Sequence, residues 1–234
     1  MYIPSLLYDT RGVPQLSQKQ INIIAERFID DFQPEVITNP SPVNIEEFVE
    51  CYLGMIPDYQ YLSHNGIYLG MIVFNDTDKI PVYDPVKKCA EYISASAHTV
   101  IVERTLLEDD KQEHRYRFTL GHEAGHDIFH PKYFKFDLGP LALLNLKIDV
   151  PPMISCRRGS IGGSQKNARN KTEKDWLEWQ ANSFSASLLM PGKAVGAVMK
   201  STMSRDAIAV VSKVFNVSKE AAGYRLVELG YIPI

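Results

Sequence analysis

Residues 118–130, FTLGHEAGHDIFH, are the part of the sequence that most restricts how this chain can fold. His122, Glu123 and His126 form an H-E-x-x-H pattern, with the two histidines four residues apart. In an α-helix, residues i and i+4 lie one turn apart on the same face, so both imidazoles can reach one ion. Most other positions in the stretch are apolar or small, which indicates a buried helix. Buried polar side chains need partners, so the fold must bring other polar groups to this helix.

A metal ion is one way to satisfy the two histidines, since zinc takes histidine nitrogen at about 2.0–2.1 Å in a tetrahedral shell. Glu123 lies about 100° round the helix from His122 and is well placed to contact a metal-bound water. The pattern therefore predicts His122 and His126 as metal ligands, with Glu123 at the reacting water. Zinc is the default from the ligand types, with manganese or another divalent ion as the alternative. A helix whose polar groups only hydrogen-bond to one another is the competing interpretation.

His130 is a weaker candidate for a ligand. It lies eight residues after His122, which is about 12 Å along the axis at a rise of 1.5 Å per residue. One ion cannot easily be shared across that span. We interpret His130 as a favourable charge at the C-terminus of the helix, before Pro131. A role beside the substrate and direct ligation are the alternatives.

A catalytic zinc needs three protein ligands and one open position. The best source of the third ligand is the stretch DWLEWQANSFSASLLMP, residues 175–191. Glu178 stands there among tryptophans and leucines, where a carboxylate is costly to bury without a partner. We predict Glu178 as the ligand and Asn182, one turn further on, as a group that orients a ligating histidine. Gln180 is neutral and a weak ligand, and a solvated position is the alternative for Glu178.

The composition is that of a globular protein with a real core. The 234 residues are 45% hydrophobic and 23% charged, and the formal net charge of -3 points to neither nucleic acid nor a membrane surface. No apolar run reaches the roughly 18 residues of a membrane-spanning helix. The N-terminal residues are a poor secretory signal. Three scattered cysteines argue against a disulfide framework and favour the cytoplasm.

The expected elements follow the order helices, sheet, helices, which makes the fold class α+β. Helices are predicted at residues 17–32 and 44–54, each opened by a capping box. Residues 56–103 predict three or four strands of a small sheet. Further helices are predicted at 112–130, 175–190, 205–215 and 219–229. Thr172 and Asp175 cap the second of these, and Pro191 and Gly192 end it.

The chain divides into three parts within one compact catalytic unit. Residues 1–154 hold the first helices, the sheet and the H-E-x-x-H helix, and residues 175–234 form a helical part with the third ligand. Residues 155–174 predict a mobile basic loop rich in Gly, Ser, Asn, Lys and Arg. A lid or a docking site for an acidic partner is the alternative for this loop. Its basic residues are Arg157, Arg158, Lys166, Arg169, Lys171 and Lys174.

The last two helices, joined at residues 216–218, also have the outline of a helix-turn-helix. The second helix offers only Lys219 and Arg225 as basic residues, against Glu220 and Glu228. A recognition helix needs more phosphate and base contacts than these. We therefore expect no direct nucleic-acid binding and interpret the tail as a helical hairpin packed on the rest of the protein.

In the H-E-x-x-H helix, in the helix that carries Glu178 and in the tail, the sequence resembles the ImmA/IrrE family of metallo-endopeptidases. The matching motifs are R-x-x-F-T-L-x-H-E-x-G-H at residues 115–126 and E-W-Q-A-N-x-F-x-A-x-L-L-M-P at residues 178–191, together with the tail at residues 209–230. H-E-x-x-H alone is shared by many metalloproteases, and the combination is much more specific. The resemblance covers most of the chain. It departs at Gln180, where many members carry an acidic residue.

The resemblance implies a zincin-like fold, in which a small mixed or antiparallel sheet packs on the H-E-x-x-H helix. It implies one zinc ion per chain, held by His122, His126 and Glu178 in a gluzincin-like arrangement, with Glu123 as general base and Asn182 beside the ligands. It also implies a cytoplasmic zinc protease of bacterial or phage origin. Better understood members cleave helix-turn-helix repressors of mobile elements or stress genes, so such a repressor is the expected partner and substrate.

Two expectations about use of the site go further. An extended substrate is expected to add to the edge of the sheet, along HTVIVE at residues 98–103. The alternative to an enzyme is a zincin-fold module that sequesters a repressor without cleaving it. The intact Glu123 favours the enzyme, because a purely structural zinc has no use for a base.

Overall fold

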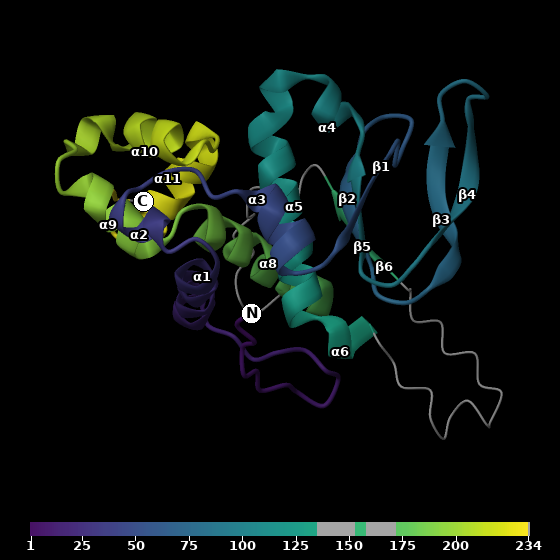
Figure 1. Ribbon diagram of the computed structural model, residues 1–234, viewed down its shortest axis with the longest axis horizontal. Coiled ribbons are helices and arrows are strands. Elements are labelled where there is room, and N and C mark those ends of the chain that lie inside the picture. Colours follow the sequence, from purple (N-terminus) through teal and green to yellow (C-terminus); the bar gives the residue numbers. More distant parts are fainter. Residues whose placement is uncertain (135–152, 158–171, 234) are drawn as a thin grey trace.

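The computed structural model describes residues 1–134, 153–157 and 172–233, and it has the α+β architecture predicted from the sequence (Figure 1). The strands are β1 (Ile56–Gln60), β2 (Tyr68–Val73), β3 (Thr77–Asp84), β4 (Cys89–Ala95), β5 (Thr99–Glu103) and β6 (Met153–Arg157). The longer helices are α1 (Gln18–Phe32), α5 (Glu113–Phe129), α8 (Glu173–Leu189), α9 (Gly192–Met199), α10 (Ala207–Phe215) and α11 (Lys219–Glu228). Shorter turns are α2 (Glu35–Thr38), α3 (Ile45–Glu47), η1 (Phe48–Tyr52), α4 (Thr105–Glu108), η2 (Asp110–Gln112), α6 (Pro131–Phe134) and η4 (Ser204–Asp206). This arrangement is compatible with a zincin-like fold.

The main sheet has the strand order β1-β5-β2-β6, with β1 parallel to β5 and the other pairs antiparallel. Its two faces belong to different cores. Val100 and Val102 of β5 pack into the large core with the helices, whereas Ile101 packs with Ile80 and Val82 of the β3–β4 hairpin. Because both faces are covered, β5 is buried along its whole length, and its three central residues are all apolar instead of alternating with polar ones.

The prediction that HTVIVE forms an edge for substrate is wrong. That segment contains β5, which is hydrogen-bonded to β1 on one side and to β2 on the other. Its backbone groups are therefore already paired and cannot accept another strand. Strand order depends on contacts distant in sequence, and a continuous apolar run looks the same in a central strand as in a buried edge strand.

The helix starts follow the local signals in the sequence. Ser17 and Gln20 form the predicted capping box of α1, and Thr172 and Asp175 form that of α8. Asn44 also caps α3, although the second predicted helix continues as the π-helical turn η1.

Several boundaries differ from the prediction. Residues 56–103 hold five strands in place of three or four. Pro191 and Gly192 end α8 as expected, but they also begin α9, which the prediction missed. Pro is favourable at the start of a helix for the same reason that it ends one, since it has no N–H to donate.

The expected basic loop is partly regular structure. Residues 153–157 form β6, paired with β2, so the first part of the predicted loop is a strand. Lys174 lies in α8. The remaining basic positions, at 158–171, lie outside the described residues.

The tail forms a helical hairpin packed on the rest of the protein. α10 ends at Asn216, which has a left-handed backbone with φ 51, and Ser218 then caps α11. Of the two basic residues in α11, Lys219 is exposed but Arg225 is only 1% exposed. A buried arginine cannot contact phosphates, which weakens the resemblance to a recognition helix further. Among the described residues, no helix is both long and apolar enough to span a bilayer.

Helices α5 and α8 pack against each other along a seam of small residues. A Cβ on Gly121 would lie 2.6 Å from Oγ of Ser185, and a Cβ on Gly125 would lie 3.1 Å from Cα of Ala181. Any larger side chain on α5 would therefore push the helices apart. The missing side chains let the two backbones approach, and this brings the polar residues beside the glycines within reach of α8.

We expect Gly125→Ala to lower the free energy of unfolding by about 1–3 kcal/mol, because the added methyl group would overpack against the backbone of α8. Urea denaturation followed by circular dichroism measures this change. The matched control is Gly223→Ala in α11, where a new Cβ would meet only Cδ1 of Ile208 at 3.7 Å. That substitution should be neutral or stabilising, since alanine favours a helix over glycine. Equal losses in the two variants would contradict the importance of the seam.

Candidate metal centre

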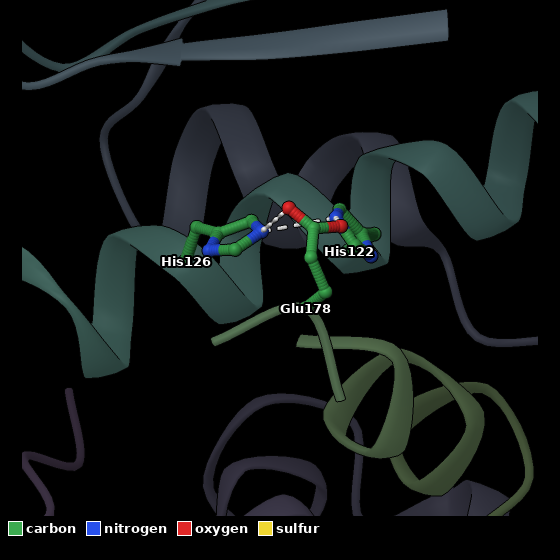
Figure 2. Close-up of side chains that lie close together, drawn as sticks. All are labelled: His122, His126 and Glu178. Carbon is green, nitrogen blue, oxygen red and sulfur yellow. Dashed lines mark hydrogen bonds and ion pairs between the residues drawn. The ribbon is translucent and has the colours of Figure 1, made fainter. Parts of the chain in front are cut away.

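His122, His126 and Glu178 converge at the contact between α5 and α8 (Figure 2). Each residue offers one ligand atom, and these atoms all lie within 4.8 Å of one another. The two histidines come from successive turns of α5, and the carboxylate reaches them from the first half of α8. The structure thus brings together the three residues that the sequence suggested as ligands.

The spacing of the three groups fits a tetrahedral ion. The Nε2 atoms of His122 and His126 are 3.0 Å apart. The Glu178 oxygens lie 3.5 Å from Nε2 of His122 and 3.8 Å from Nε2 of His126. Two ligand atoms bound to zinc at about 2.05 Å in a tetrahedral shell would be about 3.3 Å apart. Two imidazoles and a carboxylate are also a ligand set that zinc takes at catalytic sites.

Asn182 lies where the sequence predicted it, behind a histidine of the cluster. Its Oδ1 is 2.9 Å from Nδ1 of His122. An amide oxygen can only accept, so His122 donates from Nδ1 and its Nε2 keeps a free lone pair toward the cluster. An outer contact of this kind fixes both the orientation and the tautomer of a ligating ring.

His130 behaves differently from the prediction. It is fully buried, its Nδ1 is 2.8 Å from Nδ1 of His126, and its Nε2 is 3.0 Å from Oε1 of Gln180. Burial lowers the pKa of His130 to about 3, so the ring is neutral and the predicted charge at the helix C-terminus is wrong. Side chains on a helix lean toward its N-terminus, which carries this ring back over the turn that holds His126.

Sequence reasoning missed the role of Gln180, whose amide nitrogen donates to the carbonyl of Pro14 at 2.8 Å. One signal could have drawn attention to this group. His130 repeats the i, i+4 spacing of His122 and His126, so all three rings had to lie on one face of α5.

Glu123 lies in an enclosed space beside the cluster. It is fully buried, and neither carboxylate oxygen has a hydrogen-bond partner among the described residues. Gly70 of β2 provides this space, because a Cβ there would lie 2.6 Å from Oε1 of Glu123. Burial, and then the nearby Glu178, raise the pKa of Glu123 well above its usual value. An enclosed carboxyl without partners is available for proton transfer.

The histidines of α5 are held in the neutral form that binds metal. Burial lowers the pKa of His122 to about 4. Burial also lowers the pKa of His126 well below its usual value, with smaller contributions from the neighbouring His122 and His130. Neutral imidazole is the ligand form, so these shifts favour a metal over a proton.

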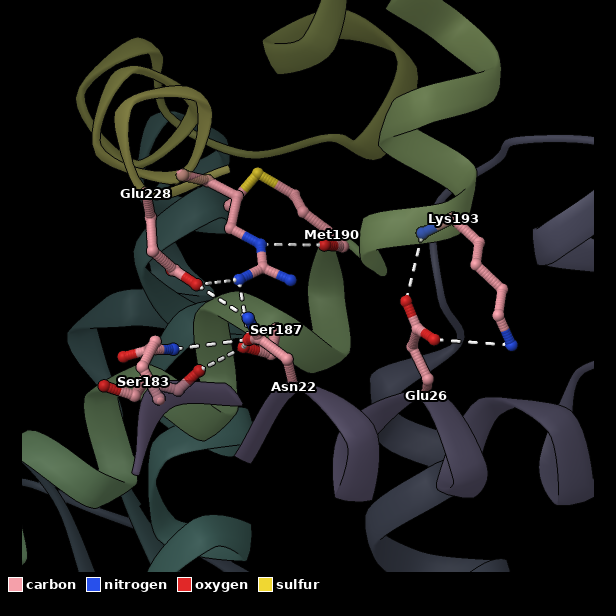
Figure 3. A network of polar contacts seen from close by, with 9 residues as sticks. Asn22, Glu26, Ser183, Ser187, Met190, Lys193 and Glu228 are labelled. Atoms are coloured by element: carbon pink, nitrogen blue, oxygen red, sulfur yellow. Dashed lines mark hydrogen bonds and ion pairs between the residues drawn. The ribbon is translucent and has the colours of Figure 1, made fainter. Parts of the chain in front are cut away.

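The far end of α8 is fixed by a second buried group, Arg225 of α11, whose partners Met190, Asn22 and Glu228 are labelled in Figure 3. Its guanidinium donates to the carbonyl of Met190 at 3.0 Å, to Oδ1 of Asn22 at 2.8 Å and to Glu228 at 2.6 Å. Ser187 of α8 donates to the same Asn22 oxygen at 2.6 Å. Charge-assisted hydrogen bonds of this kind are strong, and they join α1, α8 and α11 into one support for the helix that carries the carboxylate ligand.

The comparison with known families agrees with this geometry. The model of the Peptidase_M78 family, the IrrE N-terminal-like domain, matches residues 158–227. This match confirms the resemblance to the ImmA/IrrE family, and it suggests metallopeptidase activity and a bound metal, usually zinc. The matched span contains Glu178 and Asn182 but begins after the H-E-x-x-H helix, so the family likeness and the motif are separate observations. No curated protein matches the chain.

The lowered histidine pKa values predict how the metal-free protein responds to acid. Unfolded histidine binds a proton near pH 6.5, whereas folded His122 and His130 do so near 4 and 3. The unfolded state therefore binds more protons between these values, and stability should fall as the pH drops below 6.5. Glu123 acts in the opposite direction, since its raised pKa favours the folded state at lower pH.

We expect each buried histidine to lower the free energy of unfolding by at most about 2 kcal/mol between pH 7 and pH 5. Urea denaturation in the presence of a chelator measures it. His130→Asn removes one buried histidine and should make the dependence on pH shallower. Because Glu123 acts in the opposite direction, the comparison of variants decides: a pH dependence that His130→Asn leaves unaltered would contradict the neutral, buried state of that ring.

Proposed function

We propose that the protein is a zinc-dependent endopeptidase in which His122, His126 and Glu178 hold one zinc ion. The observation that carries this proposal is the convergence of the three groups within 4.8 Å, beside the buried carboxylate of Glu123. A catalytic zinc has three protein ligands and keeps one position open. The cluster offers three ligands and places an acid–base group next to them.

When bound, zinc supplies Lewis acidity, which polarises the carbonyl of a peptide bond and lets water act as a nucleophile near neutral pH. Glu123 accepts the proton that the attacking water gives up and delivers it to the nitrogen of the leaving amine. The new C–O bond and the broken C–N bond complete the hydrolysis. Glu123 is fully buried and has no hydrogen-bond partner among the described residues, so its carboxyl is available for this proton transfer.

We further propose that the substrate is a helix-turn-helix transcriptional repressor of a mobile element or a stress response, cleaved at a specific site in the cytoplasm. The resemblance to the ImmA/IrrE family supports this step. The exposed surface of α11 also makes a protein partner more suitable than nucleic acid, because its second basic residue, Arg225, is buried.

Metal content tests the ligand assignment. Elemental analysis of the purified wild type should find about one zinc per chain, and Glu178→Ala should lose most of it. Glu123→Gln is the matched control, since it changes a neighbouring carboxylate that is not a ligand and should keep the zinc. Full zinc occupancy in Glu178→Ala would remove Glu178 from the ligand set. A folded wild type that binds no zinc even when it is supplied would overturn the proposal.

Cleavage tests the catalytic assignment. A degenerate peptide library incubated with zinc-loaded protein should yield new peptide ends by mass spectrometry, and Glu123→Gln should reduce their formation by at least about 100-fold, the contribution of a general base. Purified helix-turn-helix repressors are the second substrate set. Equal cleavage by the wild type and Glu123→Gln would show that Glu123 is not the base. Tight repressor binding by a zinc-loaded wild type that cleaves nothing would favour the module that only sequesters its partner.

A further inference from the structure

Two buried polar residues beside the cluster have no part in the proposed hydrolysis. His130 is fully buried and Gln180 is 2% exposed, and neither offers an atom to the three-residue cluster. His130 contacts Nδ1 of His126, whereas Glu178 lies near its Nε2, and Gln180 contacts His130. Figure 2 shows one ring nitrogen of His126 toward Glu178 and the other pointing away from it. The second nitrogen is the one that contacts His130.

The direction of each hydrogen bond in this group follows from one backbone carbonyl. The oxygen of Pro14 can only accept, so the amide nitrogen of Gln180 faces it and donates. Oε1 of Gln180 therefore faces His130 and accepts from its Nε2. A neutral ring carries one proton, so Nδ1 of His130 is left as an acceptor. Nδ1 of His126 must then be the donor, which leaves its Nε2 without a proton.

We propose that His130, Gln180 and the carbonyl of Pro14 form a positioning relay that holds His126 as its Nδ1–H tautomer, with the Nε2 lone pair directed at the metal position. This inference rests on the proposed function, since the relay prepares a ligand. Both residues are positioning residues, because they act through His126 and touch neither substrate nor metal.

The relay completes what Asn182 does for His122. With Nδ1 of both rings donating outward, two Nε2 lone pairs face each other across 3.0 Å. Neither atom can donate to the other, so a cation between them removes their repulsion. Without an acceptor at its Nδ1, the ring of His126 could carry its proton on Nε2, in the place of the metal. Loss of such outer contacts typically costs 10–100-fold in metal affinity.

The test reads the tautomer and the metal affinity separately. Nitrogen-15 NMR of histidine-labelled, metal-free protein assigns the protonated nitrogen of each ring, and competition with a chromogenic chelator gives the dissociation constant for zinc. In the wild type, His126 should carry its proton on Nδ1. In Gln180→Met, which keeps the length of the side chain but removes its amide, part of the His126 population should move its proton to Nε2. The affinity for zinc should fall about 10–100-fold.

Asn182→Leu is the matched control. It removes the partner of His122, so it should change the tautomer of His122 and leave that of His126 unaltered. If Gln180 and Asn182 only stabilised the fold, the two substitutions would not each change the tautomer of a different histidine. His130→Asn is the conservative variant, because its Oδ1 can take the place of the ring Nδ1. It should retain more zinc affinity than His130→Phe, which offers no acceptor.

An unchanged His126 tautomer in Gln180→Met, or a zinc affinity within about twofold of the wild type, overturns the relay, since the expected loss is at least tenfold. If His130→Phe does not fold, Gln180→Met still decides the matter, because Gln180 contacts His130 and does not contact His126 directly. A wild type that binds no zinc would defeat the proposed function, whereas the NMR measurement on metal-free protein would still decide whether the relay sets the tautomer.

Discussion

The close approach of α5 to α8 is the constraint on which the rest of the structure depends. Gly121 and Gly125 provide it on one helix, and Ala181 and Ser185 provide it on the other. The same four-residue period that aligns the small residues also aligns the polar ones beside them. One helix face can therefore hold two imidazoles while the facing helix supplies a carboxylate and an amide. If α5 and α8 were further apart, the carboxylate and the amide of α8 could not reach the imidazoles of α5.

Tight packing also decides how the polar groups are satisfied. A contact this close leaves little room for water, so each buried group needs a direct partner or carries a desolvation penalty of about 1–3 kcal/mol. His122 has Asn182, and His126 has His130. Glu123 has no such partner among the described residues. The stability that this carboxyl gives up is consistent with a group retained for reaction, because a structural role would be served better by a hydrogen-bonded side chain.

The sequence predicted what local patterns determine. The capping boxes of α1 and α8 involve residues three apart, and a glutamate among tryptophans identified Glu178 as a buried charge that needs a partner. The central place of β5 in the sheet and the contacts of His130 could not be predicted in this way. Helical rise gives the separation of Cα atoms but not the lean of a side chain. The contact that orients Gln180 joins residues 166 positions apart, which no local pattern reveals.

The groups of the metal centre are far apart in the sequence, so they are not all present at the same time during synthesis. A ribosome adds about 5–20 residues per second, so α5 leaves it several seconds before α8. During this interval the nascent chain has both histidines but neither the carboxylate from α8 nor the amide that reaches back to Pro14. The anchoring arginine of α11 comes later still. Contacts between such distant segments form late in folding. An unfinished chain therefore has no assembled centre, because His122 and His126 provide only two of the three ligand atoms that converge in the complete protein.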